Sequence, residues 1–190
     1  MLPDNLKPIS WSFQNILDVK YKYKDSLSEQ IENCLSTQQL RDDQRDRETI
    51  ARATLVSLLT ELSVSSWLDG ERNRLTFNAN DPYSYAWDVF ALGRRIEVKK
   101  FSSRNFNINT TRRGGGCVDM HTFETFDVSE LLFACKTHFD RSKSNLIVSP
   151  AFLMDRNAYF NCRVKSERNA GYYLQYDNEA RTNENCKVYK

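Results

Sequence analysis

The chain has 190 residues and a nearly balanced charge, with 27 Lys and Arg against 25 Asp and Glu and a formal net charge of +2. This length predicts one domain with a substantial core. No apolar run approaches the ~18 residues of a membrane span. The first residues lack the apolar core of a secretory signal, so we expect a cytoplasmic protein with no membrane partner.

Helices are expected in the first third of the chain. Two weakly amphipathic stretches, 11–19 and 26–35, predict a helical N-terminal extension over residues 1–36. Ser36 and Thr37 are candidate caps for a long helix that continues to about Leu62. Its first half, 38–48, is polar and is expected to project into solvent or contact a partner. Its second half should pack on a sheet, because it carries apolar residues at helical spacing: Ile50, Ala53, Val56, Leu58 and Leu59.

Strands are expected later in the chain. Residues 63–68 predict a first strand that leaves through the turn Asp69-Gly70. Residues 130–139 and 145–148 predict two more, the second ended by Ser149-Pro150, and residues 186–190 predict an edge strand. The whole chain is therefore expected to be a single α/β domain, with a mixed central sheet flanked by helices over 37–150 and a C-terminal extension over 151–190.

The stretch 85–100 predicts a β-hairpin around Gly93. If the tight turn is Leu92-Gly93, facing residues have numbers that sum to 185, which places Asp88 opposite Glu97. Side chains alternate between the two faces of a strand. One face is then apolar and directed to a core, with Trp87, Val89, Ile96 and Val98. The other face gathers the charge, with Ala86, Asp88, Phe90, Arg95, Glu97 and Lys99.

The facing acids Asp88 and Glu97 predict a metal site. Like charges directly opposite each other destabilise a sheet. A hard cation between the carboxylates removes the repulsion, and Mg²⁺ typically binds one or two carboxylates and keeps several waters. The alternative is that Glu97 and Lys99 are solvated residues on an edge strand.

Asp88 followed by Glu97-Val98-Lys99 after a glycine turn resembles the motif of the PD-(D/E)xK nuclease superfamily, which has the restriction-endonuclease-like fold. The resemblance extends over residues 45 to 101 and departs at Trp87, where the motif has proline. It implies that Asp88, Glu97 and the backbone carbonyl of Val98 bind Mg²⁺ or Mn²⁺, and that Lys99 holds or helps to deprotonate the attacking water. The superfamily also has an acid on an upstream helix; Glu48 is our choice for it and Glu61 is the competitor.

Basic residues surround this motif. Between Phe90 and Arg113 there are seven Lys or Arg and one acid, Glu97. Such residues supply sequence-independent affinity for DNA by neutralising phosphates, although a solvated basic face is the alternative. The candidates for DNA contact are Arg94, Arg95, Lys100, Arg104, Arg112 and Arg113.

The five cysteines form an odd set without a secretion signal, which favours reduced thiols. Both histidines follow a cysteine at short spacing, so a tetrahedral zinc site is an alternative. Its ligands would be Cys117, His121, Cys135 and His138. The apolar run around Cys135 favours a buried, inert thiol instead.

Together these features predict a Mg²⁺-dependent endodeoxyribonuclease, by analogy one from a phage or mobile element and therefore active in the host cytoplasm. A homodimer would allow two strands to be cut, and a monomer would favour nicking. Two alternatives stay open: a non-catalytic DNA-binding protein that retains the nuclease fold, and a structure-specific or RNA-cleaving nuclease.

Overall fold

The computed structural model describes residues 6–41, 45–75, 77–102, 106–109, 118–165 and 172–174. The helices of this part are α1 (Phe13–Lys22), α2 (Lys24–Arg41), α3 (Arg47–Trp67), α4 (His121–Thr125), α5 (Arg156–Cys162) and the short 3-10 helix η1 (Pro82–Ser84). None of the helices in these ranges combines the length and the apolar character that a bilayer crossing requires.

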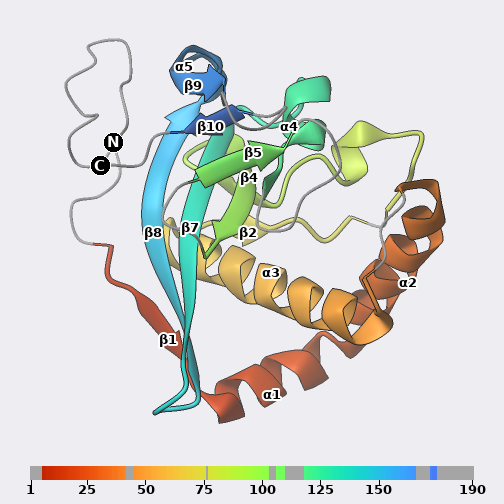
Figure 1. Cartoon of the computed structure of the whole chain (residues 1–190), viewed down its shortest axis with the longest axis vertical. Coiled ribbons are helices and arrows are strands. Elements are labelled where there is room, and N and C mark those ends of the chain that lie inside the picture. The colour runs from red at the N-terminus through yellow and green to blue at the C-terminus, as the bar shows by residue number, and fades with distance from the viewer. Residues whose placement is uncertain are drawn as a thin grey trace.

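Two sheets are found in the described residues (Figure 1). The larger has six strands in the order β1 (Ile9–Trp11), β8 (Asn145–Asp155), β7 (Leu131–Asp140), β4 (Arg94–Phe101), β3 (Val89–Ala91) and β2 (Glu71–Arg72). β4 and β7 run parallel and all other neighbours antiparallel. The smaller sheet has the order β6 (Val118–Asp119), β5 (Phe106–Asn109), β10 (Tyr172–Leu174) and β9 (Arg163–Lys165). The predicted α/β class, with a mixed central sheet flanked by helices, is confirmed.

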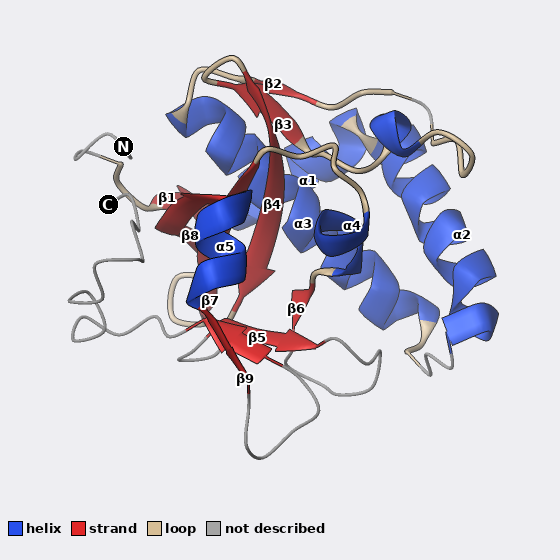
Figure 2. Ribbon diagram, turned by 90° about the horizontal axis from the view of Figure 1, so that it is seen from above, coloured by secondary structure: helices blue, strands red, loops and turns tan. Residues whose placement is uncertain are grey.

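The larger sheet has an apolar core on each face. Leu59 and Val64 of α3 pack with Val98 and Phe133 on one face. Tyr159 of α5 and Phe123 of α4 pack on the other face, in a second cluster that includes Leu132 and Met154 of the same sheet. Figure 2 shows α5 in front of the sheet and α3 behind it. The alternation of side chains along β7 and β8 therefore supplies both cores.

The predicted hairpin is confirmed in its register. Val89 pairs with Ile96, Phe90 with Arg95 and Ala91 with Arg94. The turn residues Leu92 and Gly93 both have positive φ, 57° and 71°, as a two-residue hairpin turn of this hand requires. Val89, Ile96 and Val98 lie in the core under α3 as predicted.

Trp87 differs from the prediction. It lies before β3 begins, and its indole N–H donates to the carbonyl of Tyr83 at 2.7 Å. Side chains alternate between faces only within a strand, and β3 begins at Val89, so the alternation does not apply to Trp87.

The single long helix predicted over residues 37–62 is wrong. α2 begins at Lys24 and includes Ser36 and Thr37 in its interior, and α3 begins anew at Arg47. The cap of α3 is Asp46, whose carboxylate accepts the N–H of Thr49 at 2.7 Å. A carboxylate at this position satisfies a backbone donor that the helix itself cannot, which fixes the second start.

The strand predicted at 63–68 is also wrong, because α3 continues to Trp67. Apolar residues alternate there with serines, which imitates a strand. The hydroxyl of Ser63 instead bonds within the helix, where Oγ donates to the carbonyl of Leu59 at 2.8 Å, and it also accepts from the indole of Trp11 at 3.0 Å. Trp11 belongs to β1, so the N-terminal segment contributes a strand to the sheet as well as helices.

The strands predicted at 130–139 and 145–148 are confirmed as β7 and β8, but Pro150 does not end the second. The register shifts there: Cys135 faces Pro150, whereas Ala134 faces Phe152. A bulge tolerates a residue without an N–H, so the strand passes through proline and continues to Asp155. The edge strand predicted at 186–190 lies outside the described residues.

Candidate active site

Asp88 is held at the entrance to the hairpin by two backbone contacts. Its N–H donates to the carbonyl of Ile96 at 2.9 Å, and its Oδ2 accepts the N–H of Val98 at 2.7 Å. Burial raises the pKa of the Asp88 carboxyl well above its usual range, and the negative charges of Glu97 and then Glu61 raise it further. Three carboxylates therefore interact electrostatically at this point of the sheet.

Glu97 and Lys99 form an ion pair behind Asp88. The Lys99 ammonium lies 2.5 Å from Oε1 of Glu97, whose residue is only 4% exposed. Because Glu97 is buried and β4 lies between β3 and β7, the alternative of solvated residues on an edge strand is wrong. Burial alone would lower the pKa of Lys99, but the carboxylates of Glu97 and Asp88 outweigh it, so the pKa is raised and the ammonium form prevails at neutral pH.

The second oxygen of Glu97 has no partner. Among the described residues, Oε2 is the one buried side-chain oxygen or nitrogen without a hydrogen bond. An unpaired buried polar atom is costly and calls for an explanation. A hard cation such as Mg²⁺ binds carboxylate oxygens, so the unpaired oxygen of Glu97 and the carboxylate of Asp88 are candidate metal ligands.

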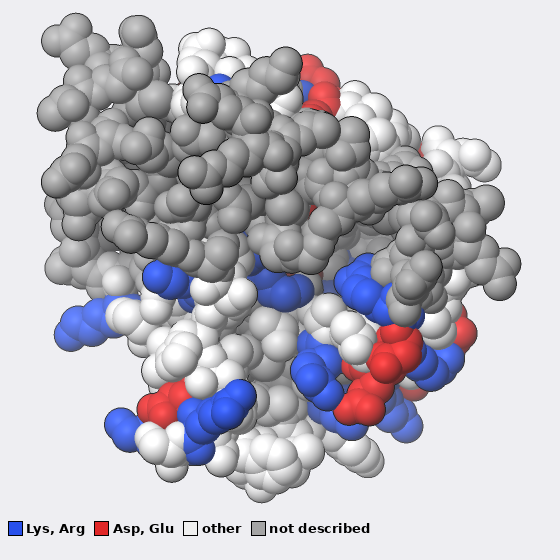
Figure 3. Space-filling view, viewed as in Figure 1, with Lys and Arg blue, Asp and Glu red and all other residues white. Residues whose placement is uncertain are grey.

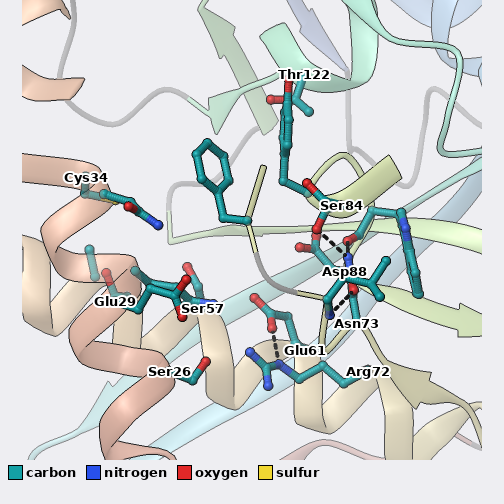
Figure 4. A pocket seen from close by; sticks show the side chains of 18 of the residues that line it. Ser26, Glu29, Cys34, Ser57, Glu61, Arg72, Asn73, Ser84, Asp88 and Thr122 are labelled. Carbon is teal, nitrogen blue, oxygen red and sulfur yellow. Dashed lines mark hydrogen bonds and ion pairs between the residues drawn. The ribbon is translucent and has the colours of Figure 1, made fainter. Parts of the chain in front are cut away.

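Asp88 opens onto a cavity of about 560 Å³ (Figure 4). α2 and α3 form one side of this cavity, and described residues of 72–75 and 77–88 form the other. Phe77, Tyr85 and Trp87 contribute rings to the wall, and the rings of Phe77 and Tyr85 lie 5.2 Å apart. Asp88 and Glu61 thus border a hollow large enough for part of a polymeric substrate, whereas Glu97 and Lys99 are not among the residues that line it.

Of the two helical acids, the structure brings Glu61 to this cavity and leaves Glu48 outside it. The Glu48 side chain is 82% exposed and pairs with Arg52 at 2.7 Å, whereas the Glu61 side chain is 14% exposed. The choice of Glu48 over its competitor is therefore not supported by its position. Helical spacing was the available signal, because Ala53, Ser57 and Glu61 follow one another at intervals of four and line the same cavity.

The predicted DNA-contacting residues are scattered or already engaged. Arg94 is exposed beside the hairpin turn. The guanidinium of Arg95 donates to the carbonyl of Val128 at 2.9 Å and lies over the ring of Tyr83. Lys100 donates to the carbonyl of Ala53 at 2.8 Å and to Ser57 Oγ at 2.5 Å.

Arg104, Arg112 and Arg113 lie outside the described residues. On the described part of the face in Figure 3, basic and acidic side chains are interspersed. The predicted surface therefore consists, as far as it is described, of one exposed arginine and two structural cations.

The zinc alternative finds no support in the described residues. Cys135 is fully buried in the core under α3, where burial raises the pKa of its thiol well above the usual range. Cys117 lies outside the described residues. Within the ranges that the structure covers, no three His, Cys, Asp or Glu side chains are grouped so as to hold a metal ion. A cation at Asp88 and Glu97 would accordingly have two carboxylate ligands and complete its shell with backbone oxygen and water.

The six-stranded mixed sheet flanked by helices is an α/β fold, and the chain matches a family of endonucleases. The chain belongs to the bacteriophage T4 endonuclease IV family, which matches residues 3–176. Endonuclease IV of Enterobacteria phage T4 is 27% identical to it over 140 residues, which cover 68% of this chain and 75% of that protein.

Proposed function

We propose that this protein is a DNA endonuclease that requires Mg²⁺ or Mn²⁺, with the cluster of Asp88, Glu97 and Lys99 as its active site. The observation that carries the proposal is the buried Oε2 of Glu97, which has no hydrogen-bond partner among the described residues and belongs to a carboxylate that interacts with Asp88. The chain also belongs to a phage endonuclease family. The PD-(D/E)xK resemblance predicts the same three residues.

Asp88 and Glu97 would hold the ion, with the backbone carbonyl of Val98 as a further ligand. Such an ion lowers the pKa of bound water and stabilises the charge that develops in phosphodiester hydrolysis. Lys99 has a raised pKa, so it is suited to donate hydrogen bonds and to offset negative charge on the phosphate, rather than to take up a proton. Glu61 replaces Glu48 as the helical acid near the ion, where its carboxylate would orient a water molecule.

The decisive experiment is incubation of supercoiled plasmid with the purified protein in Mg²⁺, Mn²⁺ or EDTA. We expect nicked or linear DNA with either metal ion and none with EDTA. Asp88→Ala and Lys99→Ala should each abolish cleavage and keep the far-ultraviolet circular dichroism of the wild type. Cleavage that survives in both variants would show that the site lies elsewhere.

A labelled RNA in the same assay separates the remaining alternatives. Cutting of RNA alone would make the protein a ribonuclease. Retention of DNA without cleavage under any metal condition would instead indicate a binding protein that keeps the nuclease fold.

A further inference from the structure

Arg72 lies beside the acid cluster and was not singled out by the sequence motifs. It belongs to β2 and pairs with Val89, the residue after Asp88. The next residue, Asn73, donates its N–H to the carbonyl of Asp88 at 2.7 Å. The side chain of Arg72 is 9% exposed, and it lines the cavity together with Glu61 and Asp88 (Figure 4).

The guanidinium of Arg72 is fixed by one edge only. Nε donates to Oε2 of Glu61 at 2.7 Å, and the group lies 5.5 Å from the centre of the Tyr23 ring. Neither terminal nitrogen has a hydrogen bond to a described residue. The guanidinium of this cavity-lining residue therefore keeps N–H donors that no described residue uses.

Two other cations near the cluster, Lys100 and Arg95, bond to the protein itself. Lys100 uses two of its donors on α3, and Arg95 is bonded to Val128. The described residues of the cavity wall include three acidic and three basic side chains, so binding of a phosphate there depends on the placement of individual cations. The charged residues of the wall are Glu29, Glu61, Asp88, Arg45, Arg72 and Lys100.

We propose that Arg72 binds a phosphate of the substrate strand inside the cavity, next to the scissile bond. Its terminal N–H groups match two phosphate oxygens, a bidentate geometry that arginine forms and lysine does not. Glu61 holds the plane in place, so little side-chain entropy is lost when the phosphate binds. This inference rests on the proposed function and names the group that positions its substrate.

The test is the salt dependence of DNA binding, because each phosphate contact contributes its own share of counterion release. Affinity for a labelled oligonucleotide is measured in EDTA over a range of KCl, and KM for its cleavage is measured with Mg²⁺ over the same range. In Arg72→Gln we expect affinity to fall about tenfold. The slope of log affinity against log salt should fall by roughly 0.7 to 0.9.

Three variants make the result specific. Arg72→Lys keeps the charge and should restore the slope, with part of the affinity. Arg141→Gln removes the same charge from the exposed turn between β7 and β8 and should keep the wild-type slope. The double variant Arg72→Gln with Glu61→Gln removes both members of the ion pair; its slope should stay low if Arg72 contacts phosphate, and should return if Arg72 merely neutralises Glu61.

An unchanged slope in Arg72→Gln, or a restored slope in the double variant, would overturn the inference and leave the nuclease intact. A wild-type protein that neither binds nor cuts DNA would instead overturn the proposed function, and this inference with it.

Discussion

The carboxylates of Asp88 and Glu97 lie in surroundings that disfavour their negative charge. Burial raises the pKa of Asp88 most, the charges of Glu97 and Glu61 raise it further, and one oxygen of Glu97 is buried without a partner among the described residues. For a group whose pKa is higher in the folded chain than in the unfolded one, the folded state binds its proton more tightly. Stability is then lost as the pH rises above the unfolded value of about 4, until the folded group has also ionised.

Replacing the strained acid should therefore stabilise the protein in the absence of divalent ions. In EDTA at neutral pH, we expect Asp88→Asn to melt at least about 2 °C above the wild type, because a neutral amide removes the repulsion and still accepts from Val98 N–H. Added Mg²⁺ should raise the melting temperature of the wild type and not of the variant.

Differential scanning calorimetry measures both effects, with Asp18→Asn on the exposed face of α1 as the control, which should match the wild type. A variant that melts below the wild type in EDTA would contradict a strained carboxylate.

At the scale of elements, α3 connects the strand of the motif to the helical acid. Lys100 of β4 is bonded to Ala53 and Ser57 of α3, which lie two turns and one turn before Glu61. Burial lowers the pKa of Lys100 to about 8 against the opposing effect of Glu61. These hydrogen bonds of Lys100 hold the cavity-lining side of α3 against the strand of the motif, whereas the side chain of Glu48 lies in solvent.

The two glutamates of α3 offer a matched comparison. We expect Glu61→Gln to lower kcat for DNA cleavage by about tenfold or more, as the loss of a group that orients water or ligands at a metal site does. Glu48→Gln should stay within about twofold of the wild type, since an exposed pair with Arg52 contributes little. Steady-state kinetics at saturating Mg²⁺ measures both; a larger loss in Glu48→Gln than in Glu61→Gln would reverse the assignment.

The elements that the sequence predicts correctly are those with a local cause. Gly93 and the two-residue turn set the register of the hairpin, and so the motif residues could be placed from their numbers alone. The strand predicted at 63–68 is wrong because a serine hydroxyl can bond within a helix as well as beside a strand. The contact between Ser63 and Trp11, which is far away in the sequence, accompanies the helical conformation and could not be predicted from spacing. Arg72 was not found because its importance arises from Glu61 and Asp88 meeting in space, and no spacing in the chain encodes that.

At the scale of the whole molecule, one sheet separates two apolar cores, and adjacent residues of β8 serve different ones. Leu153 belongs to the core under α3, and Met154 belongs to the core under α4 and α5. Since β4, β7 and β8 contribute buried residues to both cores, we expect the domain to unfold in a single cooperative transition.

Leu153→Ala and Met154→Ala test this coupling. Each deletes a buried side chain and should destabilise the protein by about 2–5 kcal/mol, which corresponds to a fall in melting temperature of roughly 4–20 °C for a chain of this size. Calorimetry should show one shifted peak in each variant, and Phe139→Ala, on a half-exposed ring of β7, should lose less. Two separate peaks would mean that the cores are independent units.

The pairing of β1 with β8 has a consequence for how the chain reaches its native state on the ribosome. Asn145 donates to Ser10 at 3.0 Å across a separation of 135 residues, so the strand at Ile9–Trp11 must wait for most of the polypeptide to be synthesised before it acquires a neighbour. Contacts of such long range are entropically slow to form. Until translation passes residue 148, β1 has no strand to pair with, and an unpaired apolar segment of this kind favours aggregation of the nascent chain.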